Sequence, residues 1–91
     1  MSSTLLVDKN GTPEPFLSDL LFAEILLALQ HRKDRYTAAR EVTTTVIAEL
    51  LDEPDKPLFK APQISLAASR VLARLDEAAW LRYTADHPSL Q

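Results

Sequence analysis

Hydrophobic positions form short β-prone runs at the start of the chain and longer helical stretches after residue 18. Residues 4–7 are rich in leucine and β-branched side chains, and residues 12–16 form a second short run after Asn10 and Gly11. An Asn-Gly pair between two such runs predicts a hairpin, because glycine readily adopts the positive φ of a tight turn. The second run contains two prolines, which cannot donate ladder hydrogen bonds, so it is predicted to be an edge strand.

The next stretch predicts a first helix from Ser18 to about Gln30. Ser18 is a suitable N-cap, and Asp19 lies in the first turn, where the helix dipole favours an acid. This helix is apolar on nearly every face, so we expect it to lie centrally among the other elements or at a subunit contact. The apolar positions are Leu20, Leu21, Phe22, Ile25, Leu26, Leu27 and Leu29.

A second helix is predicted to begin at a cap formed by Asp34 or Thr37 and to end at about Leu51. Its apolar face is formed by Ala39, Val42, Val46, Ile47 and Leu50. Residues 52–57 are polar and contain two prolines, which predicts a loop. Residues 58–61 then predict a short third strand.

The third helix has the cleanest amphipathic pattern in the sequence, and Pro62 is well placed in its first turn. Its apolar positions are Ile64, Ala67, Ala68, Val71, Leu72 and Leu75. Asp76 is predicted to cap a fourth helix that ends before Pro88. The side chains of Ala79, Trp80 and Tyr83 on that helix are predicted to pack against the core.

The composition fits one small globular domain over residues 1–91. The chain is 46% hydrophobic and 25% charged, which provides a dense core for so short a domain. Its formal net charge is −3, which argues against a general nucleic-acid binder, since such proteins are usually basic.

The sequence contains no cysteine, which excludes disulfides, thiolate metal sites and a cysteine nucleophile, and which fits a reducing compartment. The longest apolar run, residues 20–29, includes Glu24 and is about half of the roughly 20 residues that a membrane-spanning helix needs. We therefore expect a cytoplasmic protein without a membrane segment.

The sequence does not predict an enzyme. The only two histidines, His31 and His87, stand near predicted helix ends, where a histidine usually interacts with the helix dipole. No local motif combines a nucleophile, a base and an orienting acid. The acidic residues also lack the alternating spacing of a calcium loop, so no metal site is predicted.

Two stretches carry a family resemblance. The first, LLVDKNGTPEPF, has Val7, a tip from Asp8 to Gly11, Glu14 and Phe16; the second is ISLAASRVLARLDEAAWLRY, residues 64–83. They resemble the ATP-cone, the small nucleotide-sensing domain of many ribonucleotide reductases and of the repressor of their genes. That family opens with a strand valine, a Lys-Arg-Asp-Gly hairpin tip, a glutamate and an apolar residue. It closes with a helix pair of the form Leu-Asp-x-x-Ala-Tyr-x-Arg-Phe/Tyr.

The resemblance implies an α+β fold, in which a four-helix bundle is covered by a small three-stranded sheet made of the N-terminal hairpin and one short strand. It implies that ATP or dATP, usually with Mg²⁺, binds between the sheet and the helices. Binding would change oligomeric assembly and thereby exert allosteric regulation. The implied partners are a ribonucleotide reductase subunit or further copies of the chain.

The resemblance also implies roles for individual residues. Lys9, with Lys60 as a second candidate, would contact phosphate. Val7 and Phe16 would frame the base, and Glu14 would contact the base or the sugar. With the hairpin tip and a polar contact on the third helix, the candidate nucleotide-binding residues are Val7, Lys9, Asn10, Gly11, Glu14, Phe16, Lys60 and Ser65.

Three positions depart from the family pattern. Asp8 stands where the family has its first tip lysine, unless a one-residue gap lets Lys9 serve. Leu20 replaces a second phosphate lysine, and Ala61 replaces a hydroxyl-bearing residue, with Lys60 adjacent. An aspartate facing a triphosphate would repel it. The alternative is therefore an ATP-cone-like fold that has lost its ligand and serves as a protein-interaction or oligomerisation module.

Overall fold

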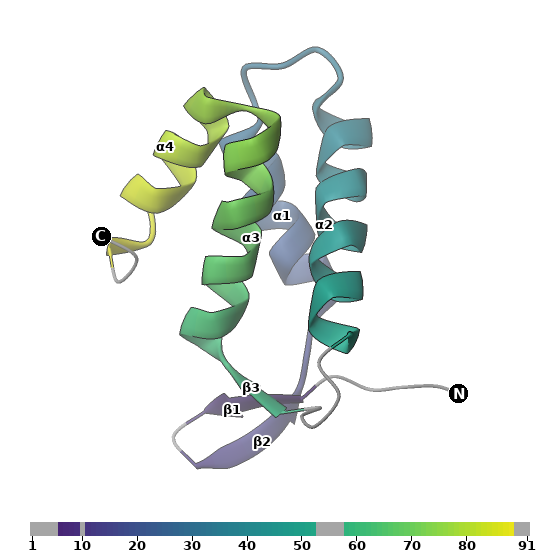
Figure 1. Ribbon diagram of the computed structural model, residues 1–91, viewed down its shortest axis with the longest axis vertical. Coiled ribbons are helices and arrows are strands. Elements are labelled where there is room, and N and C mark those ends of the chain that lie inside the picture. Colours follow the sequence, from purple (N-terminus) through teal and green to yellow (C-terminus); the bar gives the residue numbers. More distant parts are fainter. Residues whose placement is uncertain (1–5, 10, 53–57, 89–91) are drawn as a thin grey trace.

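A computed structural model describes residues 6–9, 11–52 and 58–88 (Figure 1). Within these ranges the chain forms four helices and a small three-stranded sheet, which confirms the predicted α+β fold with a helical bundle. The elements are β1 (Leu6–Lys9), β2 (Thr12–Pro15), α1 (Ser18–Ala28), α2 (Arg35–Leu51), β3 (Leu58–Lys60), α3 (Ala61–Leu75) and α4 (Glu77–Ala85). Most of the predicted loop 52–57 lies outside the described residues.

The sheet lies across one end of the helices, as Figure 1 shows, and has the strand order β2-β1-β3. Strands β1 and β2 form the predicted antiparallel hairpin, in which Val7 is opposite Glu14. Strand β3 pairs with β1 in parallel and places Phe59 beside Val7. Strand β2 is at the edge of the sheet, where its two prolines, which have no backbone N–H, need not donate to a second neighbouring strand.

Helix α1 differs from its prediction in two respects. It follows Leu17, which occupies the N-cap position without a side-chain hydrogen bond, so the prediction that Ser18 is the cap is wrong. It also ends at Ala28, two residues before Gln30. The helix is not enclosed by other elements, because only one of its sides is buried, while Leu20 is 57% exposed.

Helix α2 begins at the boundary marked by Asp34, and Thr37 lies inside the helix. The Asp34 side chain does not cap α2; its two carboxylate oxygens accept hydrogen bonds from Arg32 instead, at 2.8 and 3.0 Å. The predicted apolar face is buried, except that Ile47 is only partly covered. Thr43 is also buried, and its hydroxyl has no hydrogen-bond partner among the described residues.

The starts of α3 and α4 follow from local sequence. The Lys60 backbone N–H donates to Gln63 Oε1 over 2.8 Å, and Pro62 lies in the first turn of α3. Asp76 caps α4 as predicted, since its Oδ1 accepts a hydrogen bond from the Ala79 N–H at 3.1 Å.

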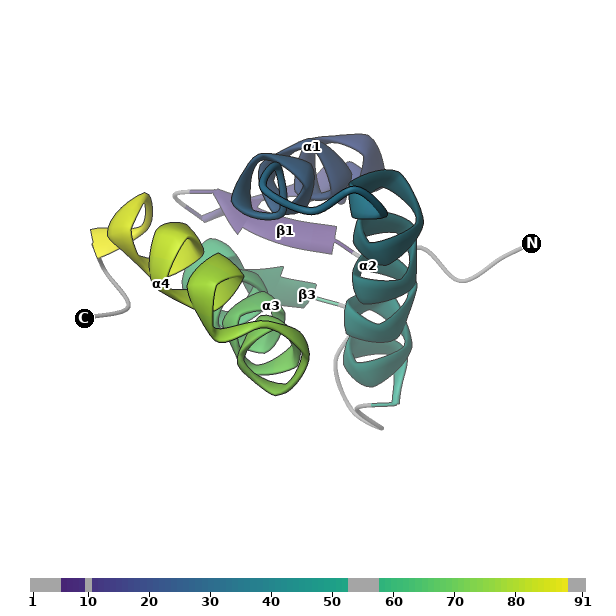
Figure 2. The same ribbon diagram turned by 90° about the horizontal axis from the view of Figure 1, so that it is seen from above.

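The helices pack around one hydrophobic core. Helix α1 packs against α2 and α4, and α3 packs against α2 and α4 on the other side; Figure 2 shows this arrangement from above. Val7 and Phe59 extend the core into the sheet. The largest fully buried side chains are Tyr83, Ile25, Leu29, Leu72 and Val46. Across the described ranges, no helix combines the length and the apolar character needed to cross a membrane.

Candidate functional site

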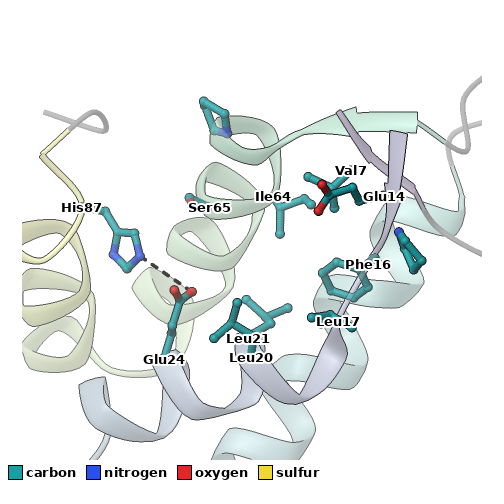
Figure 3. Close-up of a pocket in the computed structure, with 12 residues that line it drawn as sticks. Val7, Glu14, Phe16, Leu17, Leu20, Leu21, Glu24, Ile64, Ser65 and His87 are labelled. Atoms are coloured by element: carbon teal, nitrogen blue, oxygen red, sulfur yellow. Dashed lines mark ion pairs between the residues drawn. The ribbon is translucent and has the colours of Figure 1, made fainter. Parts of the chain in front are cut away.

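A pocket of about 390 Å³ opens where the hairpin, α1, α3 and the segment after α4 meet. This volume lies in the range of small-molecule sites. Figure 3 shows its lining side chains. The apolar part of the lining includes Val7, Phe16, Leu17, Leu20, Leu21 and Ile64. The polar part is Glu14, Glu24, Ser65 and His87.

The two ends of the pocket differ in chemistry. At the sheet end, Figure 3 shows Val7, Phe16 and Leu17 close together, with Glu14 beside Val7. At the opposite end, Glu24 of α1 faces His87, which follows α4. The sheet end therefore suits a flat apolar group, and the opposite end suits a group that carries hydrogen-bond donors.

His87 is held from two sides. Its Nδ1 lies 2.7 Å from the Tyr83 carbonyl oxygen, and its ring stacks on the Tyr83 ring with 4.0 Å between centroids. Because a carbonyl oxygen only accepts, Nδ1 carries the proton of this hydrogen bond. That leaves Nε2 facing the pocket, 3.7 Å from Oε1 of Glu24.

Tyr83 lies behind this end of the pocket. Burial raises the pKa of its phenol to about 12; the Ser65 hydroxyl acts in the opposite direction, and the charge of Glu24 raises the pKa further. The Tyr83 hydroxyl oxygen is buried and has no hydrogen-bond partner among the described residues, so its contact with Ser65 is not a hydrogen bond. Tyr83 is therefore a neutral packing residue at ordinary pH.

The described lining carries acidic groups and no lysine or arginine. Leu20, at the position where the ATP-cone pattern has a phosphate-binding lysine, contributes an apolar side chain to the lining. The pocket itself can therefore hold an apolar or aromatic group whose N–H and O–H donors meet the two carboxylates. A polyphosphate would meet two carboxylates and no lysine or arginine among these residues, so it is expected to lie outside the pocket.

Four of the eight predicted site residues come together in this pocket: Val7, Glu14, Phe16 and Ser65. Of the other four, Gly11 and Lys60 are not among the described lining residues. Gly11 lies in the hairpin connection with a φ of 86°, and Lys60 is exposed at the end of β3. Lys9 is the last residue of β1, but its side chain, like Asn10, lies outside the described residues.

Sequence reasoning missed Glu24 and His87 as pocket residues. One signal for Glu24 was available, since it is the only charge in the apolar run 20–29. His87 stands four residues after Tyr83, a spacing that brings side chains together at the end of a helix. Neither signal shows that the two residues face each other, because that depends on how α1 and α4 pack.

A second polar cluster lies away from the pocket, where the α1–α2 connection meets the start of α4. Asp76 Oδ2 is 3.0 Å from His31 Nε2 and 3.0 Å from an Arg32 guanidinium nitrogen. The hydrogen bond from the Ala79 N–H lowers the pKa of Asp76 most, and the contacts with His31 and Arg32 lower it further, to about 2. This cluster joins two helix connections and contributes none of the described lining of the pocket, so we assign it a structural role.

Comparison with known protein families and with curated proteins gives no match to this chain. Within the described ranges, no group of three or more histidine, cysteine or acidic side chains could hold a metal ion.

Proposed function

We propose that this chain is a regulatory nucleotide-binding module that senses ATP or dATP, as the resemblance to the ATP-cone implies. One observation carries the proposal: residues predicted from two distant stretches of sequence line the same pocket, with Val7, Glu14 and Phe16 from the hairpin region and Ser65 from α3. The proposed role is regulatory rather than catalytic. The proposed setting is the cytoplasm, since a sequence without cysteine fits a reducing compartment.

The chemistry of the pocket supports one orientation of the ligand. The adenine ring packs between Val7 and Phe16 at the apolar end, where burial of an aromatic ring is favourable. Glu14 lies at the same end and accepts a hydrogen bond from the exocyclic amino group. A carboxylate suits this contact, because an amino group donates and a carboxylate only accepts.

The phosphates extend beyond the pocket towards the ends of β1 and β3. These strands are parallel and hydrogen-bonded, and they end at Lys9 and Lys60, with Asp8 paired to Lys60. Two lysines at neighbouring strand ends would offset the acidic character of the lining and of Asp8. A Mg²⁺ ion, where present, is carried by the triphosphate.

Isothermal titration with ATP and dATP tests the proposal. We expect saturable binding by the wild type and its loss in Ser65→Leu, which fills the pocket from α3. Thr44→Leu adds the same side chain at an exposed site on α2 and serves as the matched control. Absence of binding at millimolar nucleotide, with the fold intact by circular dichroism, would refute the proposal.

A second candidate function is a protein-interaction module that binds no nucleotide. Exposed leucines on and beside α1 favour it: Leu17 is 63% exposed and Leu27 is 59% exposed. Light scattering separates the two functions. Assembly that is independent of nucleotide and is abolished by Leu27→Gln supports the interaction module, while assembly that requires ATP or dATP supports nucleotide sensing.

A further inference from the structure

We propose that copies of this chain assemble head to tail, with the exposed face of α1 in one copy against the exposed face of α3 in the next. The assembly goes beyond nucleotide binding and does not depend on it. A second copy of the chain is then the partner that covers the exposed leucines of α1. Two properties of α1 and α3 carry the proposal, namely the sign of their charges and the leucines that each helix exposes.

Helices α1 and α3 carry charges of opposite sign. The charged side chains of α1 are Asp19 and Glu24, both acidic, and those of α3 are Arg70 and Arg74, both basic. Helices α2 and α4, in contrast, each carry both signs. Arg74 is paired with Glu49, whereas Arg70 is exposed and forms no ion pair among the described residues. Asp19 is exposed as well, so Asp19 and Arg70 are opposite charges that another copy can reach.

Both helices also expose leucine beside these charges. On α1, Leu20 and Leu27 are each more than half exposed and lie two turns apart on the same side of the helix. On α3, Leu66 is 41% exposed and lies one turn before Arg70. Exposed apolar area next to charge is typical of interaction surfaces. Contact between the two faces would bury leucine from both copies and would bring the acidic helix against the basic one.

The placement of the two helices favours a chain of copies over a closed dimer. Figure 2 shows α1 and α3 on opposite sides of the bundle, with α2 and α4 between them. Both helices start next to the sheet and end at the opposite end of the bundle, so they run in the same direction (Figure 1). A second copy in the same orientation therefore brings its α3 alongside α1 of the first copy. Such a contact leaves one face free at each end, so that further copies can add.

Static light scattering without nucleotide tests the assembly. We expect the mean mass of the wild type to exceed the 10.2 kDa of one copy and to keep rising with concentration up to about 1 mM, since small interfaces are weak. Asp19→Lys and Arg70→Glu should each keep the chain monomeric, because each places like charges across the contact. An equimolar mixture of the two variants should assemble again, because every contact between unlike copies then joins opposite charges.

Two control variants change the charge in the same way on another helix. Glu41→Lys and Arg40→Glu alter exposed residues of α2 and should leave the assembly unchanged. Circular dichroism of all four variants establishes that each one is folded.

Each alternative outcome overturns a defined part of the proposal. A wild type that stays monomeric overturns the assembly and leaves nucleotide binding untouched, since no nucleotide is present. A mass that levels off at two copies overturns the head-to-tail arrangement. Assembly that persists in both face variants, or a mixture of the folded variants that stays monomeric, overturns the pairing of α1 with α3. Equal loss of assembly in the α2 controls also overturns this pairing.

Discussion

Asp76 connects three parts of the chain through one carboxylate, and its replacement gives the sharpest stability prediction. The side chain is only 15% exposed. It accepts hydrogen bonds from the Ala79 N–H at 3.1 Å and from Arg32 at 3.0 Å, and its Oδ2 lies 3.0 Å from His31. Asp76→Ala removes the cap of α4 and the polar contacts that join the α1–α2 connection to the α3–α4 junction.

The loss of stability expected for Asp76→Ala comes mainly from the loss of the helix cap. Loss of an N-cap side chain costs about 1 kcal/mol, within a range of roughly 0.5–2. The ionic contacts add little, because His31 and Arg32 are partly solvent-exposed and such pairs are screened. We therefore expect Asp76→Ala to lower the free energy of unfolding by about 1–2 kcal/mol. Asp76→Asn should lower it less, because asparagine caps helices about as well as aspartate.

The stability difference between the wild type and Asp76→Ala should depend on pH. The pKa of Asp76 is about 2 in the folded chain against an ordinary value of 3.8, so the unfolded chain binds the proton first as the pH falls. The stabilisation by the ionised carboxylate is thus complete above pH 3.8 and is lost as the pH falls towards 2. Urea unfolding followed by circular dichroism at pH 7 and pH 2.5 should show a smaller difference between wild type and Asp76→Ala at the lower pH.

Two results would refute this account of Asp76. One is an Asp76→Ala variant as stable as the wild type at pH 7. The other is a stability difference that stays constant between pH 7 and pH 2.5. Asp86→Ala, a substitution just after α4 at an exposed site, is the control and should not destabilise the chain.

Three further substitutions test the core and the hairpin by urea unfolding. Thr43→Val should leave stability equal or raise it by about 1 kcal/mol, because it removes a buried hydroxyl with no hydrogen-bond partner among the described residues; a clear loss would contradict this. Ile25→Ala should cost about 2–5 kcal/mol, since Ile25 is fully buried, and a cost below 1 would mean that the core is loosely packed. Gly11→Ala should cost about 1 kcal/mol through its φ of 86° alone, because no neighbouring atom would contact an added Cβ; an unchanged stability would show that the turn relaxes.

Local sequence rules predicted the fold where one rule dominates. The Asn10-Gly11 pair predicted the hairpin. The two prolines of β2 predicted that this strand lies at the sheet edge, because proline has no backbone N–H to donate to a second neighbouring strand. Asp76 predicted the start of α4, because a capping side chain acts within four residues. These features depend on a few neighbouring residues, so they can be predicted from sequence.

The remaining features depend on packing. Helix α1 has no clear apolar face, so its pattern could not show which leucines are buried, and Leu20 lines the pocket while being more than half exposed. The contact between Glu24 and His87 depends on the approach of α1 to the end of α4, which no local rule describes. The four predicted site residues that line the pocket came from the family pattern rather than from periodicity, and Glu24 and His87 lay outside that pattern.

Mapping of the bound nucleotide by two-dimensional ¹H–¹⁵N NMR tests the central claim most directly, because it reports both binding and its place. Titration with ATP should shift the backbone amides of Val7, Phe16 and Ser65 saturably, and should leave Thr44 on the exposed side of α2 unchanged. Spectra that do not change at millimolar ATP would contradict the claim. So would saturable shifts confined to the region around His31 and Asp76.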